Sequence, residues 1–131
     1  MNTAEAARWL AYARSDLDAG RTLLNDLDHY PRQVCFLAQQ AAEKALKSIL
    51  VFLEIEFPYT HDLDRLRDLI PPGWRVKIEH PDLADLTIWS VEARYPGDLP
   101  YVVEGDARNT LQIAEAIYQT VVDDWQKHIQ G

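Results

Sequence analysis

With 131 residues, the chain is long enough for one domain of ordinary size with a hydrophobic core of its own. Hydrophobic residues make up 47% of it and charged residues 26%, which is typical of globular proteins and excludes an intrinsically disordered chain. The net charge of −8 argues against general binding to duplex DNA, because such binding draws its affinity from Lys and Arg side chains that contact phosphates.

The apolar spacing predicts two long helices in the first half of the chain. The first is capped by Asn2 or Thr3, continues to about Leu27 and ends before Pro31. The second covers residues 34–53 and contains no Gly or Pro. Because the connection between them is short, we expect the two helices to be antiparallel neighbours. The second helix has a broad apolar arc rich in alanine and, opposite it, a polar strip that consists of Gln39, Gln40, Glu43, Lys44 and Lys47.

The second half of the chain is predicted to contain one short helix and two longer ones. Thr60 can cap the short helix, and the segment 74–79 is expected to be irregular. A longer helix is predicted from Pro81 to about Ala93, and the last one covers roughly residues 106–130. The sequence therefore predicts a single all-α domain over residues 1–131, an antiparallel up-and-down bundle of four main helices plus one short helix.

The sequence gives no sign of a membrane span or of disulfide chemistry. Its longest apolar run, at 48–55, is interrupted by Glu54 and is far shorter than the roughly 20 residues that cross a bilayer. The first residues do not have the pattern of a signal peptide. The single cysteine, Cys35, cannot form an internal disulfide. We therefore expect a cytoplasmic protein without a membrane partner.

Three blocks of sequence resemble the HEPN domain (higher eukaryotes and prokaryotes nucleotide-binding). They read FLAQQAAEKALK at 36–47, THDL at 60–63 and ARYP at 93–96, and the resemblance covers nearly the whole chain. It implies a helical bundle that commonly forms a homodimer. It also implies a prokaryotic setting in which such proteins often accompany a minimal nucleotidyltransferase, frequently as a toxin–antitoxin-like pair.

Many members of this family are RNases that need no metal and carry Arg, then His after four to six residues, near the end of the penultimate helix. The resemblance puts Arg94 at the arginine position, but residues 95–101 contain no His. Arg75 and His80 have the right spacing but lie in the connection before the fourth helix. The resemblance therefore favours a binding module without the usual catalytic pair, and neither a metal nor a cofactor is expected.

The polar strip has two interpretations. Glu43 and Lys47 have the spacing of a helix-stabilising ion pair, so the strip could be an ordinary solvated face. The second interpretation rests on the family resemblance. It implies a groove at a dimer boundary, where the strip would contact a nucleotide or an RNA phosphate through Gln40, Glu43, Lys44 and Lys47.

His61, Arg94 and Tyr95 are the remaining candidate ligand-binding residues. His61 at the start of a short helix is either a capping or packing residue or a group that orients a polar ligand beside Arg94. A metal site is disfavoured, because no other His has metal-ligand spacing to it. Arg94 either caps a helix C-terminus or binds an anion, with Tyr95 stacking on a base.

Three hypotheses follow. The first is a dimeric HEPN module that binds a nucleotidyltransferase partner and a nucleotide or single-stranded RNA. The second is a metal-independent ribonuclease that uses His61 or His80 with Arg94 or Arg75. The third is a non-catalytic helical dimer that serves as an adaptor.

Overall fold

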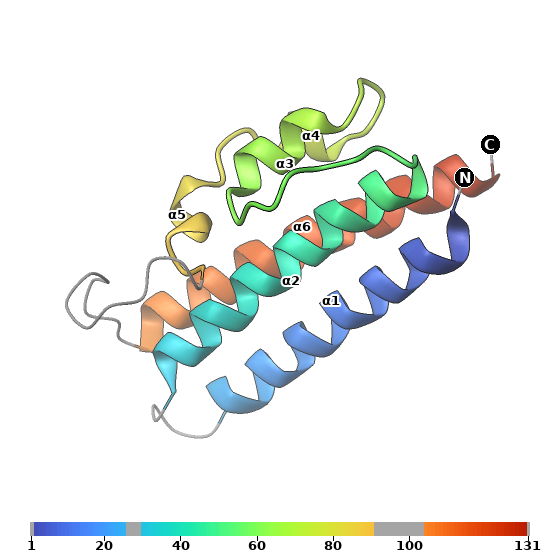
Figure 1. The fold of residues 1–131 in the computed structure, drawn as a ribbon. Helices are drawn as coiled ribbons and strands as arrows, with labels where there is room; N and C mark the ends of the chain where they lie inside the picture. The colour runs from blue at the N-terminus through green and yellow to red at the C-terminus, as the bar shows by residue number, and fades with distance from the viewer. Residues whose placement is uncertain (1, 26–29, 91–103, 131) are drawn as a thin grey trace.

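In the computed structural model of the protein, residues 2–25, 30–90 and 104–130 are described (Figure 1). These residues form helices and no strand. The helices are α1 (Thr3–Leu24), α2 (Pro31–Phe52), α3 (Leu63–Leu69), α4 (Val76–Glu79), α5 (Ala84–Thr87) and α6 (Glu104–Gln130). None of the helices in the described ranges has both the length and the apolar character that crossing a bilayer would require.

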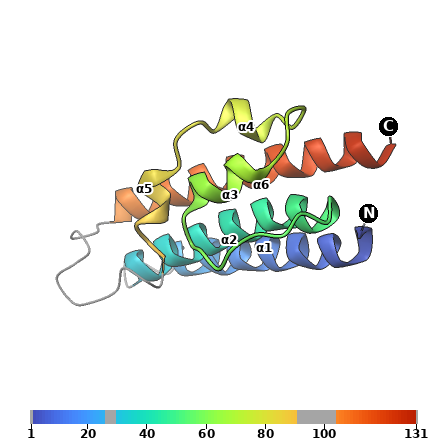
Figure 2. The same cartoon turned by 45° about the horizontal axis from the view of Figure 1, so that its top comes forward.

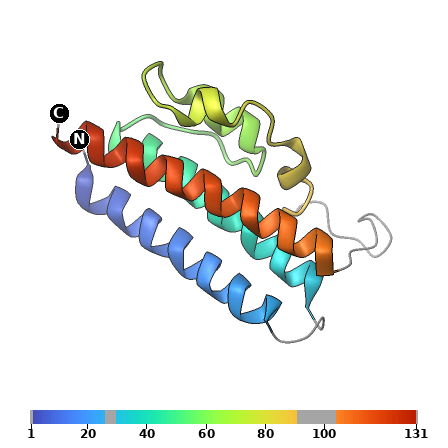
Figure 3. The ribbon, with the colours of Figure 1, turned by 180° about the vertical axis from the view of Figure 1, so that it is seen from behind.

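The three long helices form the body of the bundle. α2 packs against both α1 and α6, and α1 also contacts α6. α1 runs antiparallel to α2, whereas α6 runs in the same direction as α2, as Figures 1 and 3 show. The short helices α3, α4 and α5 lie on the side of the bundle away from α1 (Figure 2). The predicted all-α, up-and-down architecture is therefore confirmed, with the short helix α5 in the region of the predicted fourth helix.

α1 forms where its cap and its apolar stripe predict it. The side chain of Asn2 accepts a hydrogen bond from the backbone N–H of Glu5 at 3.2 Å. The buried face has the expected spacing and includes Gly20. A Cβ atom on Gly20 would lie 3.1 Å from Cδ1 of Leu111 on α6. Gly20 therefore marks a close crossing of α1 and α6.

α2 is the central helix, and its alanines allow close packing on both sides. It begins at Pro31 rather than at Val34, because proline suits the first turn of a helix, where its missing N–H is not needed. Cys35 is buried within it. The predicted apolar arc is confirmed, since its members from Ala38 to Ile49 are fully buried: Ala38, Ala41, Ala42, Ala45, Leu46 and Ile49.

The cap of α3 differs from the prediction. Asp62, not Thr60, is the N-cap, and its carboxylate accepts hydrogen bonds from the N–H groups of Asp64 at 3.1 Å and Arg65 at 3.3 Å. Thr60 acts one step earlier, where its hydroxyl accepts from the N–H of Asp62 at 3.1 Å. Both residue types suit a cap, so the THDL sequence alone did not determine which one fills that position.

The segment 74–79 is not irregular, because it contains the single helical turn of α4. The turn is held in place at its start. Val76 is fully buried, and its N–H donates to Oδ2 of Asp124 on α6 at 3.2 Å. This contact comes from a residue far along the chain, which explains why local alternation did not predict it.

The long helix expected from Pro81 to about Ala93 is replaced by the four-residue helix α5; residues 91–93 lie outside the described residues. After α5 the N–H groups of Trp89 and Ser90 bond to carbonyls three residues back, at 3.2 and 3.0 Å, so the chain tightens instead of continuing as an α-helix. Thr87 is fixed by tertiary contact, since its hydroxyl accepts from the N–H of Leu63 at 3.1 Å. The packing of α5 against α3 therefore overrides its helical pattern.

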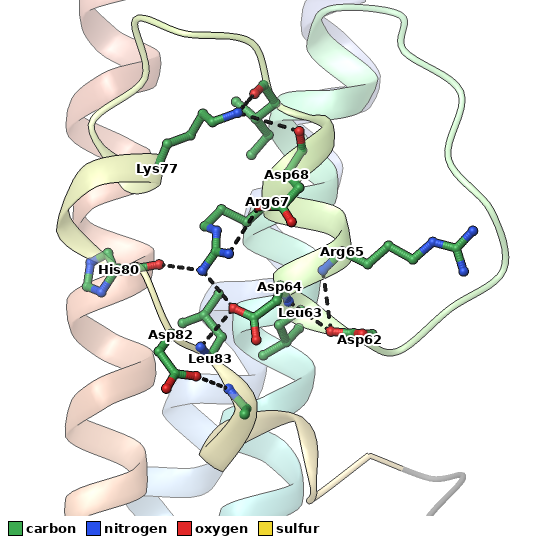
Figure 4. Close-up of polar contacts among 12 residues, drawn as sticks. Asp62, Leu63, Asp64, Arg65, Arg67, Asp68, Lys77, His80, Asp82 and Leu83 are labelled. Atoms are coloured by element: carbon green, nitrogen blue, oxygen red, sulfur yellow. Dashed lines mark hydrogen bonds and ion pairs between the residues drawn. The ribbon is translucent and has the colours of Figure 1, made fainter.

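A buried arginine fastens α3 to the connection between α4 and α5 (Figure 4). Nη1 of Arg67 donates to Oδ1 of Asp64 at 2.6 Å and to the carbonyl of His80 at 2.9 Å. Oδ1 of Asp64 also accepts from the N–H of Leu83 at 2.9 Å. Because every group in this cluster has a partner, it acts as a structural clamp.

Candidate functional site

The polar strip of α2 is not a solvated face. Gln39 is fully buried and Glu43 is 5% exposed. Both are covered by residues 53–62, which turn back along α2 after the helix ends (Figure 1) and are called the covering segment below. The segment is fastened there by His61, whose carbonyl accepts from Nε2 of Gln39 at 3.5 Å. The interpretation of the strip as an ordinary exposed ion pair is therefore wrong for Glu43.

Glu43 is the centre of this buried network. Its Oε1 atom accepts from Nδ1 of His61 at 2.7 Å and from Nε2 of Gln39 at 3.1 Å, and its Oε2 atom accepts from Nζ of Lys47 at 3.0 Å. Burial raises the pKa of the carboxyl, but the three hydrogen bonds and the charge of Lys47 lower it by more. The net result is a pKa below the ordinary value of 4.5, so Glu43 is ionised at neutral pH.

Lys47 is enclosed and is not free to reach a phosphate. Only 12% of its side chain is exposed. Its Nζ atom lies 5.6 Å from the ring centre of Trp9 on α1 and 5.4 Å from that of Phe57 in the covering segment. Two aromatic faces and the carboxylate of Glu43 together stabilise the cation in this position.

The other two strip residues are held by neighbours as well. Nζ of Lys44 donates to Oδ2 of Asp16 on α1 at 2.6 Å, in an ion pair that is largely shielded from solvent. Nε2 of Gln40 donates to Oε1 of Gln39 at 2.7 Å. The strip is thus a chain of mutually satisfied polar groups, and both of its lysines already have an anionic partner.

His61 is the strip's link to the surface. An ionised Glu43 can only accept, so Nδ1 of His61 carries the proton of the short contact between them. In the neutral imidazole, Nε2 is then an acceptor. Tyr59 lies next to it, with a ring-centre distance of 5.4 Å and an interplanar angle of 73°. The pair resembles a carboxylate–histidine arrangement in which the acid fixes the tautomer and the orientation of the ring.

Arg75 and His80 do not form a common site. Nη2 of Arg75 donates to Oε1 of Glu79 at 2.8 Å, on the solvent side of α4. The ring of His80 instead faces α6, where its Nε2 lies 3.1 Å from Oγ1 of Thr120. That hydroxyl donates to the carbonyl of Ala116 at 2.9 Å, so its oxygen accepts a hydrogen bond from the Nε2–H group of His80. Burial lowers the pKa of His80 below 6.5.

Arg94 and Tyr95 lie outside the described residues. Their predicted contact with a ligand beside His61 therefore stays a prediction. The described residues contain no group of three or more His, Cys, Asp or Glu side chains arranged to hold a metal ion.

Several residues of the site were not among the sequence candidates. Gln39 was placed on the polar strip but not among the ligand-binding candidates, although residues 39, 43 and 47 lie at successive four-residue steps and therefore share one helix face. Trp9, Asp16 and Phe57 could not have been found, since only the packing of α1 and of the covering segment brings them to α2.

Comparison with known proteins agrees with the fold and the sequence blocks. The profile of the HEPN domain matches residues 6–125. The crystal structure of TT1696 from Thermus thermophilus is similar, with a TM-score of 0.79 and 27% identity, over 95% of this chain and 99% of that one. The structure of ST0689, described as an archaeal HEPN homologue, has a TM-score of 0.69 and 27% identity, over 90% of this chain and 95% of that one.

Among curated proteins, none matches the sequence. The family profile nevertheless extends over nearly the whole bundle, from α1 to the last turns of α6. On this basis, the chain belongs to the HEPN domain family.

Proposed function

We propose that the chain is a nucleotide- or RNA-associated HEPN module that binds without cleaving, acts as a homodimer, and works with a minimal nucleotidyltransferase in a toxin–antitoxin-like pair. The observation that carries the proposal is the HEPN match over residues 6–125. The sequence supports binding rather than cleavage, because no His follows Arg94 within 95–101.

His80 follows Arg75 at the spacing of the RNase motif, and the contacts of these two residues also favour a binding role. Arg75 and His80 are each engaged elsewhere, with Glu79 and Thr120. A general base must reach the proton that it removes, and a phosphate-steadying arginine must reach the same substrate. The contacts of Arg75 and His80 point to stabilisation of α4 and of its packing on α6.

Apolar surface on the long helices supports the homodimer part of the proposal. Tyr12 on α1 is 62% exposed, and Ile113 and Ile129 on α6 are 40% and 47% exposed. Light scattering coupled to gel filtration should give the mass of a dimer. A monomer at micromolar concentration would contradict the proposal.

A ribonuclease is the second candidate, and one observation favours it. The carboxylate of Glu43 holds His61 with Nε2 as its proton-accepting nitrogen, which is the tautomer that a general base requires. In this alternative His61 would remove the proton of a ribose 2′-hydroxyl, and Arg94 would steady the phosphate.

Incubation of the purified protein with single-stranded RNA in excess EDTA separates the two candidates. The binding module should leave the RNA intact, while nucleotide, RNA or the partner protein raises its melting temperature. Cleavage in EDTA that is lost in His61→Ala or His80→Ala would establish the ribonuclease. A protein that does neither would be the plain adaptor.

A further inference from the structure

The covering segment presents an exposed aromatic ring beside a histidine whose ring is held from within. Tyr59 is 87% exposed, whereas only 12% of the His61 side chain is exposed. Their rings meet edge to face. A tyrosine this exposed contributes little to the core, so its apolar face is available to a flat ligand.

The second ring nitrogen of His61, Nε2, is unpaired as far as the described residues are concerned. The one buried side-chain nitrogen or oxygen without a partner in these residues is Nε1 of Trp125. Among the described residues, nothing therefore occupies the acceptor position of His61 Nε2, which an N–H or O–H group of a ligand would take.

The imidazole is fixed before any ligand arrives. Glu43 holds Nδ1, and Gln39 holds the backbone carbonyl of the same residue. On the other side, Asp62 caps α3 and so fixes the chain directly after His61. An acceptor held in this way loses little conformational freedom on binding, which favours affinity.

The two lysines of the polar strip offer no free charge to an anionic group beside His61. Lys44 and Lys47 are already paired with Asp16 and Glu43. Asp62 follows His61 directly and caps α3, and Asp64 is paired with Arg67. A phosphate would meet no free cation among these groups, whereas a base ring can stack on a tyrosine and donate a hydrogen bond to Nε2.

We propose that Tyr59 and Nε2 of His61 form a subsite for a nucleobase, which stacks on the tyrosine ring and donates an N–H hydrogen bond to the imidazole. Glu43 is a positioning residue, because it keeps the proton on Nδ1. This inference rests on the proposed function, since it names the part of a nucleotide or single-stranded RNA that the module recognises.

Nuclear magnetic resonance tests the site in two stages. In isotope-labelled protein, long-range proton–nitrogen spectra at neutral to mildly alkaline pH should show His61 with its proton on Nδ1. Glu43→Gln should lose this tautomer preference. The Nε2–H tautomer in the native protein would overturn the proposal.

In the second stage the protein is titrated with AMP, GMP, CMP and UMP and with a short single-stranded RNA. Binding should shift the signals of His61 Nε2 and of the Tyr59 ring. Tyr59→Ala should weaken binding by about tenfold, the loss expected for one stacked base. Tyr59→Phe should bind like the native protein, and Ile78→Ala, which removes an exposed apolar side chain on α4, is the control.

The outcomes separate the two proposals. If nucleotide or RNA binds while the signals of His61 and Tyr59 do not move, the subsite is wrong and the proposed function stands. If none of these probes binds to folded protein, the nucleotide- or RNA-binding part of the proposed function fails, and the subsite fails with it. If Glu43→Gln does not fold, the tautomer of the native protein and the Tyr59 variants still decide.

Discussion

Glu43 shows how a helical bundle can bury a carboxylate without leaving it unpaired. Its two oxygens accept from three side chains, and one of these donors, Lys47, carries the opposite charge. Burial of an ion pair is favourable only when the remaining lone pairs and protons also find partners. Here Gln39 and His61 supply those partners, and His61 also connects the network to the covering segment.

Replacing Glu43 should therefore destabilise the fold strongly. Glu43→Ala should lower the free energy of unfolding by about 3–5 kcal/mol, because it leaves the enclosed cation of Lys47 without its anion. Urea denaturation followed by circular dichroism measures the change.

Glu79 provides the control for this experiment. It pairs with Arg75 at the same four-residue spacing, but on the surface of α4. Glu79→Ala should change the stability little, because exposed pairs are screened by water. Equal losses in the two variants would contradict the account of the Glu43 network.

His80 makes the stability of the fold depend on pH. Its folded-state pKa lies below the unfolded value near 6.5, because burial disfavours the charged ring. Between these two values the unfolded chain binds more protons than the folded one. The stability that the neutral ring contributes is thus present above pH 6.5 and is lost as the pH falls through that window toward the folded pKa.

We expect the unfolding free energy to decrease between about pH 7 and pH 5, and His80→Gln should reduce the slope. Urea midpoints measured across this range give the result. His128→Gln is the comparison for the slope alone, because His128 is exposed near the end of α6 but its ring stacks on Trp74 with the ring centres 3.7 Å apart, so the variant is expected to lower the absolute stability. A slope that is unchanged in His80→Gln would show that other groups cause it.

At the scale of elements, the close contact of α1 with α6 depends on the absence of a side chain at Gly20. A Cβ atom there would lie 3.1 Å from Cδ1 of Leu111, which is closer than ordinary van der Waals contact. Alanine gains about 1 kcal/mol over glycine in a helix interior. Overpacking costs a similar amount, so the two effects oppose each other.

A double-mutant cycle separates these effects. Gly20→Ala alone should leave the unfolding free energy within about 1 kcal/mol of the native value. In a Leu111→Ala background, where the clash is absent, the same change should stabilise by about 0.5–1 kcal/mol. Thermal melts of the four proteins give the coupling energy, and a coupling of zero would show that Leu111 moves aside freely.

The clamp formed by Arg67 should matter more than any surface arginine of α3. Arg67→Met should cost about 2–3 kcal/mol, because it leaves the carbonyl of His80 without its donor and Asp64 without its cation. Arg65 belongs to the same helix, but its side chain points away from the clamp in Figure 4. Chemical denaturation of Arg65→Met should show almost no change, and similar losses in both variants would contradict the clamp.

Elements with a complete local pattern were predictable from sequence. α1, α2 and α6 each bury a stripe that the three-four spacing predicts. The predictions failed at α4 and α5, whose bounds depend on Asp124 and Leu63, residues distant in sequence. The site was predictable in part: the spacing placed Glu43 and Lys47 together, but their burial depends on the segment that returns along α2.

At the scale of the whole molecule, the net charge of −8 is combined with lysines that are already paired at the candidate site. Nonspecific affinity for duplex DNA requires several free cations along one face. Fluorescence anisotropy with a labelled random duplex at physiological salt should therefore show no binding. Binding that weakens steeply with added salt would show that the other cations of the chain form a basic surface.

The order of the helices has a consequence for synthesis on the ribosome. α1 and α2 are made before α6, against which α2 also packs. At about 5–20 residues per second, the stretch from the end of α2 to the end of α6 takes on the order of 4–16 s to translate. During that time the face of α2 that α6 will cover is open to other nascent chains. Codon choices that slow translation beyond residue 52 would prolong this exposure and lower the yield of folded protein.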